Sequence, residues 1–187
     1  MNMNSAFPYL LLVCTLLIPL VSSCSEHHNQ VGEHTQVLHS GLNGITYESV
    51  LADTVSNKKV IRSEEEWKEL LTSNEYRILR NGGTEMPIVN KYNSIYEDGI
   101  YVCAACGNPL FHSDTKYKSG SGWPSYWKPI RDDAVGERED NSFFLTRTEI
   151  ICNRCDSHLG HVFDDGPEPT GLRYCINSAA LKLISNK

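Results

Sequence analysis

The sequence lacks any cluster of basic residues, and this absence narrows the functions that it can serve. Its 187 residues contain 17 Lys and Arg against 23 Asp and Glu, which gives a formal net charge of −6. A nucleic-acid-binding surface needs Lys and Arg gathered on one face, so we expect no nucleic-acid partner. Hydrophobic residues make up 40% of the chain, which is typical of a folded domain rather than of a disordered chain.

Charged side chains are also missing from the first 23 residues. Within this segment, an apolar run from Tyr9 to Val21 is interrupted only by Thr15 and Pro19. A helix that spans a bilayer needs about 20 apolar residues, so the run is too short for a membrane span. Its length instead matches the apolar region of a secretory signal.

The end of this segment, Val21 to Cys24, resembles the lipobox of bacterial lipoproteins, in which the cysteine is acylated and becomes the new N-terminus. Acyl chains stabilise membrane attachment by about 0.8 kcal/mol per buried CH₂. The resemblance implies a signal peptide at 1–23, a lipid anchor at Cys24 and a cell-envelope location, on the periplasmic or outer-membrane side. Ser25 favours the outer membrane. An ordinary cleaved signal is the alternative, because no Lys or Arg precedes the apolar run.

The stretch that follows the signal, 24–58, is mostly polar and carries four histidines. We predict that it is a flexible tether between lipid and domain. Residues 44–62 have a mixed composition, and we expect no strong structure there. The folded domain is therefore predicted at 59–187.

Two short helices are predicted at the start of this domain. Ser63 and Glu66 form a capping box, in which a hydroxyl and a carboxylate satisfy N–H groups at the helix N-terminus. A second helix is expected to begin at Thr72 or Ser73 and to end at the Gly82–Gly83 pair.

Beyond these helices, short segments rich in β-branched and aromatic residues are separated by Gly, Pro and Asp turns. Such segments are typical of strands. They lie at 100–103, 143–146, 149–152, 161–163 and 172–176. The sequence therefore predicts a mainly β core.

Two CxxC pairs, Cys103 with Cys106 and Cys152 with Cys155, each follow a predicted strand. Two thiolates on a tight turn can bind one side of a tetrahedral Zn²⁺ ion, and a second turn can supply the other side. Four thiolates leave no open position, so we expect one structural zinc per chain. Two alternatives stay open: disulfides, if the compartment is oxidising, or a redox-active CxxC pair.

Cys175 stands alone in the predicted strand 172–176. A lone cysteine in a strand is commonly a small buried hydrophobic residue. However, alternate residues of a strand share a face, so Arg173 and Asn177 are expected beside Cys175. A neighbouring guanidinium favours the thiolate and lowers the thiol pKa. The three groups together indicate a site rather than core packing.

Four longer motifs carry a family resemblance: Ser119–Ser125, His158–Phe163, Gly166–Gly171 and Arg173–Ser178. They strongly resemble type B methionine sulfoxide reductases in the zinc-binding form, over about residues 63–183. The resemblance implies a mainly β fold, with two antiparallel sheets that form a barrel-like sandwich, short N-terminal helices and a zinc site of four cysteines. It also implies reduction of the R-sulfoxide of methionine, free or within proteins, with a thioredoxin-like thiol as reductant.

By position, the resemblance assigns Cys175 as the catalytic nucleophile and Trp123 as the aromatic wall that receives the substrate methyl group. His161 is expected to donate a proton to the sulfoxide oxygen, with His158 in a supporting role. Structural alternatives stay open: the indole as plain core, and His158 as a residue that only holds a loop. The remaining predicted residues are the catalytic pair Arg173 and Asn177 and the substrate-binding Asp165, which is also a candidate turn residue.

One position departs from the family pattern. Many members carry a resolving cysteine two residues before the motif tryptophan, and this chain has Ser121 there. Serine cannot form a disulfide with an oxidised Cys175. Cys24 is a poor substitute if acylated, and zinc-bound thiolates are occupied. We therefore expect an external thiol to reduce a sulfenic acid at Cys175.

Two functions from other classes compete with the reductase. A zinc-ribbon binding module explains the four paired cysteines but gives Trp123, Arg173 and Cys175 no purpose. A disulfide-stapled envelope protein is the other. Metal analysis separates the disulfide-stapled protein from the reductase and the zinc-ribbon module, since zinc-bound CxxC thiols cannot be disulfides.

Overall fold

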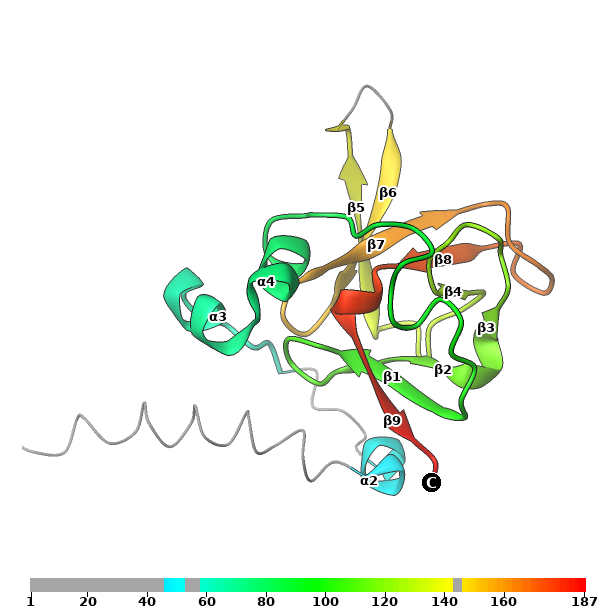
Figure 1. The fold of residues 1–187 in the computed structure, drawn as a ribbon, viewed down its shortest axis with the longest axis horizontal. Helices are drawn as coiled ribbons and strands as arrows, with labels where there is room; N and C mark the ends of the chain where they lie inside the picture. The colour runs from blue at the N-terminus through cyan, green and yellow to red at the C-terminus, as the bar shows by residue number, and fades with distance from the viewer. Residues whose placement is uncertain (1–45, 53–57, 143–145) are drawn as a thin grey trace, which may run out of the picture.

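Two antiparallel sheets form the body of the protein in the computed structural model, which describes residues 46–52, 58–142 and 146–187 (Figure 1). The smaller sheet has the order β2-β1-β9 and the larger has the order β3-β4-β8-β7-β6-β5. The smaller sheet contains β1 (Gly99–Cys103), β2 (Pro109–His112) and β9 (Leu181–Ser185). The larger contains β3 (Lys116–Tyr117), β4 (Ser125–Tyr126), β5 (Val135–Asp140), β6 (Arg147–Cys152), β7 (His158–Phe163) and β8 (Arg173–Ile176).

This architecture confirms the predicted mainly β fold with two antiparallel sheets. Among the described residues the larger sheet keeps β3 and β5 as free edges, so the arrangement is sandwich-like and not a closed barrel. Short 3-10 turns, η1 (Ser113–Thr115) and η3 (Ser178–Ala180), lead into β3 and β9.

Aromatic side chains join the two sheets. Phe111 of β2 stacks on Tyr126 of β4, with ring centroids 4.3 Å apart. Tyr101 of β1 meets the same Tyr126 ring edge-on at 5.3 Å. All three side chains are fully buried, and burying one side chain of this size contributes about 1.5–3 kcal/mol. The apolar layer between the sheets therefore fixes β4, which pairs with β8, relative to β1 and β2.

Two predicted helices pack on one side of this layer. Ser63 caps α3 (Glu64–Leu70) and Thr72 caps α4 (Ser73–Leu79), and each cap is a complete capping box. The second helix ends at Leu79, and Gly82 follows with a φ of +64°, a conformation that favours glycine. Both helix predictions are confirmed.

A third helix, α2 (Tyr47–Ala52), lies inside the stretch for which we predicted a flexible tether and no strong structure. The prediction is wrong for these six residues. The Tyr47 hydroxyl contacts His112 Nε2 at 2.9 Å, and Val50 packs against Ile100 and Val102 of β1. A single turn with two apolar anchors is too weak a pattern to stand out in the sequence.

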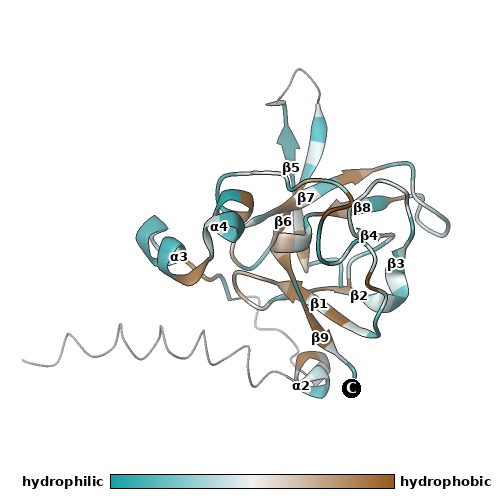
Figure 2. Ribbon diagram, in the orientation of Figure 1, coloured by the Kyte–Doolittle hydropathy of each residue, from teal (hydrophilic) through white to brown (hydrophobic). Residues whose placement is uncertain are grey.

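Four strand predictions overlap β1, β6, β7 and β8, while β2, β3, β4, β5 and β9 were missed. The hairpin of β5 and β6 is hydrophilic at its far end and extends from the body (Figure 2). The predicted strand 143–146 falls largely on residues outside the described part of the chain, as do the signal at 1–23 and the anchor at Cys24. No helix within the described ranges is long and apolar enough to cross a membrane.

Candidate active site and metal centre

Strand pairing places Cys175 at the centre of the larger sheet. Cys175 of β8 lies opposite Ser125 of β4 on one side and opposite His161 of β7 on the other. Residues that face each other across an antiparallel pair share a face of the sheet. A cavity of about 110 Å³ opens on this face. Its lining consists of Thr84, Trp123, Arg147, Gly160, His161, Phe163, Cys175 and Asn177.

The cavity therefore brings together four of the predicted site residues: Cys175, His161, Trp123 and Asn177. The other three, His158, Arg173 and Asp165, are not among its lining residues. His158 contacts His161 and Arg173 contacts Phe163, both of which line the cavity, while Asp165 is bound to Arg173. Their predicted roles in catalysis and substrate binding stay predictions.

The Cys175 thiol is partly buried, and burial raises its pKa above the ordinary value. A hydrogen bond with Ser121 and the positive charge of Arg173 act in the opposite direction. The expected lowering by Arg173 thus exists, but desolvation outweighs it. The net rise in pKa disfavours the thiolate, and a proton must leave the thiol before it can act as a nucleophile.

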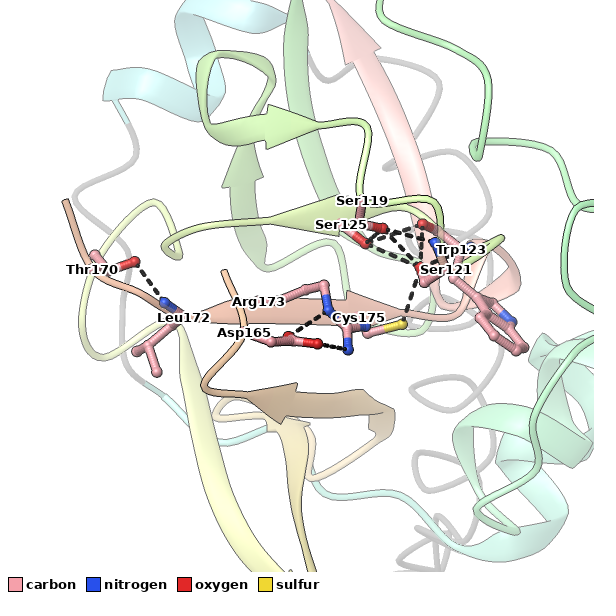
Figure 3. Close-up of polar contacts among 9 residues, drawn as sticks. All are labelled: Ser119, Ser121, Trp123, Ser125, Asp165, Thr170, Leu172, Arg173 and Cys175. Atoms are coloured by element: carbon pink, nitrogen blue, oxygen red, sulfur yellow. Dashed lines mark hydrogen bonds and ion pairs between the residues drawn. The ribbon is translucent and has the colours of Figure 1, made fainter. Parts of the chain in front are cut away.

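Arg173 is held by an exposed carboxylate. Its Nε and Nη2 atoms donate to the two Asp165 carboxylate oxygens at 2.7 and 2.8 Å, and its guanidinium lies 4.3 Å from the Phe163 ring centroid. This bidentate pair fixes the planar guanidinium beside Cys175. In Figure 3 the sulfur lies between the ion pair and the indole of Trp123.

His161 is supported by two residues that the sequence reasoning missed. Its Nε2 lies 2.8 Å from Asp140 Oδ2, which also accepts from Arg147 at 2.7 Å. Burial lowers the His161 pKa, while the hydrogen bond to Asp140 raises it. Asp140 and Arg147 face each other at the ends of β5 and β6, so only the strand register could have revealed them.

His158 is buried and lies behind His161. Its Nδ1 is 2.7 Å from Glu149 Oε1, and the two imidazole centroids are 5.5 Å apart. The Nε2 atom of His158 is buried and has no hydrogen-bond partner among the residues that the structure describes. The neighbouring His158 ring is one of the groups that lower the pKa of His161.

The segment before β1 holds Trp123 and Asn177 in place through Glu85. The indole N–H of Trp123 donates to the Glu85 carbonyl oxygen at 3.2 Å, and the Glu85 N–H donates to Asn177 Oδ1 at 3.1 Å. The Glu85 carboxylate accepts from the backbone N–H groups of Ser178 and Ala179. Nothing local in the sequence marked Glu85, because its partners lie about 90 residues away.

The Asn177 side chain is fully engaged in this arrangement. Besides accepting from Glu85, it donates from Nδ2 to the Leu159 carbonyl oxygen at 3.1 Å. Its amide thus ties β7 to the segment before β1, and Asn177 lines the cavity. Asn177 follows the end of β8 and begins the turn into η3.

The four paired cysteines meet where the two sheets approach each other. Cys103 ends β1 and Cys152 ends β6. The sulfur of Cys103 lies 3.8 Å from that of Cys155, and the sulfur of Cys106 lies 3.6 Å from that of Cys152. All four side chains are buried and carry free thiols.

These distances fit a tetrahedral ion. Four sulfurs at about 2.3 Å from a zinc ion stand about 3.8 Å apart, whereas a disulfide needs about 2.05 Å. Hydrogen bonding with Cys106 and the other two sulfurs, together with burial, raises the pKa of Cys103 well above its ordinary value. The pKa of Cys106 is raised as well, while hydrogen bonding with the other three sulfurs lowers that of Cys155. Ionisation of all four thiols is therefore favourable only with a cation that compensates their charges. The residues present therefore suit a structural zinc.

The two turns that carry these sulfurs repeat one another. Gly107 N–H donates to Cys103 O at 2.8 Å, and Asp156 N–H donates to Cys152 O at 2.9 Å. Both Gly107 and Asp156 have positive φ, +73° and +56°. The matching geometry identifies two knuckles that face one centre and link the two sheets.

A partly buried thiol, set in a cavity with an imidazole and an indole and separated from a closed cluster of four cysteines, defines a thiol-dependent oxidoreductase. A family model, the SelR domain, matches residues 71–185. The chain is 57% identical over 126 residues to a protein of Leptospira interrogans, with 67% of this chain and 96% of the relative covered. It is 53% identical over 127 residues to a protein of Hahella chejuensis, with 68% and 91% covered.

A protein of the archaeon Methanosarcina mazei is 55% identical over 127 residues, with 68% of this chain and 91% of the relative covered. All three relatives carry the name peptide methionine sulfoxide reductase MsrB. The chain belongs to this family, the type B methionine sulfoxide reductases.

Proposed function

We propose that this chain reduces the R-sulfoxide of methionine, in proteins or free, to methionine, with Cys175 as the nucleophile. The observation that carries the proposal is the cavity of about 110 Å³ in which Cys175, His161 and Trp123 meet. Its volume suits one narrow side chain rather than a large ligand. The names of the relatives supply the substrate class.

The lining suits the parts of a sulfoxide. The indole of Trp123 packs the terminal methyl group, which orients the sulfur toward Cys175 and selects one epimer. His161 supplies a proton to the oxygen, and Asp140 holds the ring from its Nε2 side. Arg173, fixed by Asp165, stabilises the thiolate once the proton has left.

The chemistry balances in three steps. The Cys175 thiol and the sulfoxide give a cysteine sulfenic acid and methionine, as the oxygen passes from the substrate sulfur to the cysteine sulfur. An external thiol, such as that of thioredoxin, then attacks the sulfenic acid to form a mixed disulfide and water. A second thiol releases Cys175 and leaves the donor as a disulfide. Ser121 cannot replace the external thiol.

A direct test follows turnover of a dabsylated methionine R-sulfoxide with dithiothreitol. Cys175→Ser is expected to abolish turnover, and the S-sulfoxide serves as the matched control that neither protein reduces. Mass spectrometry after one turnover without reductant should place a single added oxygen on Cys175. Full activity of Cys175→Ser would overturn the assignment of the nucleophile. An inactive wild type with bound zinc and a free Cys175 thiol would favour a zinc-binding module without chemistry.

We also propose that the cysteine cluster of 103, 106, 152 and 155 holds one structural Zn²⁺. The spacing of the sulfurs and their burial support this. The ion would fix the ends of β1 and β6 to one another and would take no part in the reaction. Metal analysis of the purified protein should give about one zinc per chain. Protein without metal and with two disulfides would contradict the proposal.

The lipid anchor remains a proposal from the sequence. We propose that residues 1–23 are removed as a signal and that acylated Cys24 attaches the enzyme to a membrane of the bacterial envelope. The support is the lipobox-like Val21–Cys24 alone. Growth with a labelled fatty acid should label the wild-type chain and not Cys24→Ala. Equal labelling of both would rule out this anchor, and inner and outer membrane fractions distinguish the two locations.

A further inference from the structure

An exposed apolar ridge stands beside the candidate active site. Four consecutive apolar residues, Met86 to Val89, are all exposed. The exposed fractions are 72% for Met86, 73% for Ile88 and 83% for Val89. Runs of this length at a surface oppose folding and solubility, so where they occur they commonly serve binding. We use the name apolar ridge for Met86, Ile88 and Val89.

The backbone of the ridge is strained at its centre. Ile88 has a φ of +68°, which is a rare conformation for a β-branched residue. Neither the conformation nor the exposure favours isoleucine here, since Asn or Gly would suit both better. Strain of this kind persists where the surroundings enforce it and is concentrated at functional sites.

Hydrogen bonds to Gly122 hold the ridge in this conformation. The Ile88 N–H donates to the Gly122 carbonyl oxygen at 2.7 Å. The Asn90 side chain donates to the same oxygen at 2.8 Å and to the Met86 carbonyl oxygen at 3.2 Å. Gly122 directly precedes Trp123 in the chain. The ridge is therefore built onto the residue next to the indole that lines the reaction cavity.

The ridge separates two surface hollows. Ile88 and Trp123 line a hollow of about 330 Å³ together with Tyr96. Met86 and Val89 line a larger hollow of about 730 Å³ on the other side. Trp123 also lines the reaction cavity, so the Ile88 hollow and the place where we propose that the sulfoxide binds share the indole as a common wall.

We infer that the apolar ridge binds apolar side chains that flank the oxidised methionine in an extended polypeptide. This inference rests on the proposed function and names the substrate that the enzyme favours. A cavity of about 110 Å³ accepts one side chain, so the residues before and after it must lie over the rim. Successive residues of an extended chain advance about 3.3–3.6 Å. The neighbours of the sulfoxide therefore reach Ile88 on one side and Met86 and Val89 on the other.

The test compares two substrates with dithiothreitol as reductant. One is a pentapeptide with leucine on both sides of methionine R-sulfoxide, and the other is N-acetyl-methionine R-sulfoxide amide. Ile88→Asn should lower kcat/KM for the pentapeptide about tenfold and leave the small substrate unchanged, because asparagine accepts positive φ. Ile61→Asn is the matched control, since Ile61 is 90% exposed and lines neither hollow; it should change neither value.

Three results would overturn the inference. Equal loss on both substrates would show that Ile88 only supports Trp123. No loss on either would show that the ridge binds nothing in this reaction. A loss that appears only when thioredoxin replaces dithiothreitol would assign the ridge to the reductant. Failure of the proposed function looks different, because the wild type would then reduce neither substrate.

Discussion

The hydroxyl of Ser121 lies 3.8 Å from the sulfur of Cys175. Ser121 occupies the position at which many type B relatives are expected to carry a resolving cysteine. Its oxygen also contacts Ser119 Oγ at 2.8 Å and Ser125 Oγ at 3.4 Å, so the thiol faces a cluster of three hydroxyls (Figure 3). The fold therefore places residue 121 as close to Cys175 as a resolving thiol would need to be. Because that residue is serine, it offers Cys175 a hydrogen bond and cannot form a disulfide.

Ser121→Cys should allow the sulfenic acid at Cys175 to be resolved within the chain, without affecting the formation of methionine in the first step. The new sulfur would stand close to Cys175, and attack on the sulfenic acid would expel water and leave an intramolecular disulfide. Mass spectrometry after one turnover without reductant should then show the loss of two hydrogens in place of the added oxygen. The amount of methionine formed in that turnover should equal that of the wild type. A sulfenic acid that persists in Ser121→Cys would contradict this interpretation of the geometry.

Ser121→Ala should raise the pKa of the Cys175 thiol further. Burial already raises that pKa, and the hydrogen bond with Ser121 is the largest contribution in the opposite direction. Removing the hydroxyl leaves less thiolate at neutral pH, so we expect alkylation by iodoacetamide to slow about threefold there. The rate of alkylation rises with pH as the thiol ionises, and the midpoint of this rise should move to higher pH in Ser121→Ala. Ser119→Ala is the control, and a shift as large as that of Ser121→Ala would show that the cluster acts only as a whole.

The surroundings of Cys175 show most clearly which features of the site could be predicted from the sequence. The alternation of a strand predicted Arg173 and Asn177 beside Cys175, and the family resemblance predicted Trp123 at the same site. Trp123, Cys175 and Asn177 do line one cavity. Arg173 acts on the Cys175 thiol in the predicted direction. Its guanidinium also pairs with Asp165 and lies over the Phe163 ring, which the alternation could not predict. The alternation of side chains along a strand predicts on which face of the sheet a side chain lies. It does not predict the rotamer of that side chain, which depends on partners from other elements.

Other site residues were beyond sequence reasoning for a physical reason. Asp140 lies in the charged segment of β5, whose residues 137–139 are exposed and carry no apolar alternation. Glu85 lies in a segment without regular structure. Each reaches the site through tertiary pairing, Asp140 through the β5–β6 register and Glu85 through the N–H groups before β9. The capping box at Ser63, and Thr72 as one of two candidate caps, could be predicted because the atoms of each cap lie within one turn.

Asp140→Asn should lower the pKa of His161. The Asp140 carboxylate raises that pKa through its hydrogen bond, while burial and Arg147 lower it. If protonated His161 is the proton donor, kcat falls as pH rises through this pKa. The falling limb of the kcat profile should therefore move to lower pH in Asp140→Asn, with about tenfold less activity at neutral pH.

Arg147→Gln should change the pKa of His161 in the opposite direction from Asp140→Asn. The positive charge of Arg147 lowers the His161 pKa, so its removal should move the falling limb to higher pH. A limb that stays fixed in both variants would show that His161 is not the group that titrates in kcat.

Cys106→Ser should release the metal and destabilise the fold. Three thiolates and a hydroxyl bind Zn²⁺ far more weakly than four thiolates, and the lost binding free energy is lost folding free energy. We expect a fall on the order of 5 kcal/mol, measured by thermal unfolding alongside metal content. Cys175→Ser is the control and should keep both zinc and stability. Unchanged melting of a metal-free Cys106→Ser protein would show that the cluster needs no ion.

Gly160→Ala should prevent β7 and β8 from pairing beside Cys175. A methyl group at position 160 would overlap the backbone carbonyl of Cys175, and backbone in the middle of a sheet cannot move aside. Gly136 of β5 is the matched control. A methyl group there would meet the Asn153 side-chain oxygen at 2.6 Å and the Ile151 side chain, both of which can rotate away.

We therefore expect Gly160→Ala to lose more than about 4 kcal/mol of unfolding free energy, and Gly136→Ala to lose about 1 kcal/mol or less. Thermal unfolding of the zinc-loaded proteins measures both changes. Where Gly160→Ala still folds at low temperature, Cys175 would be displaced from His161 and turnover should be absent. An active Gly160→Ala enzyme with an ordinary melting temperature would mean that β7 and β8 do not approach each other as closely as this pairing requires.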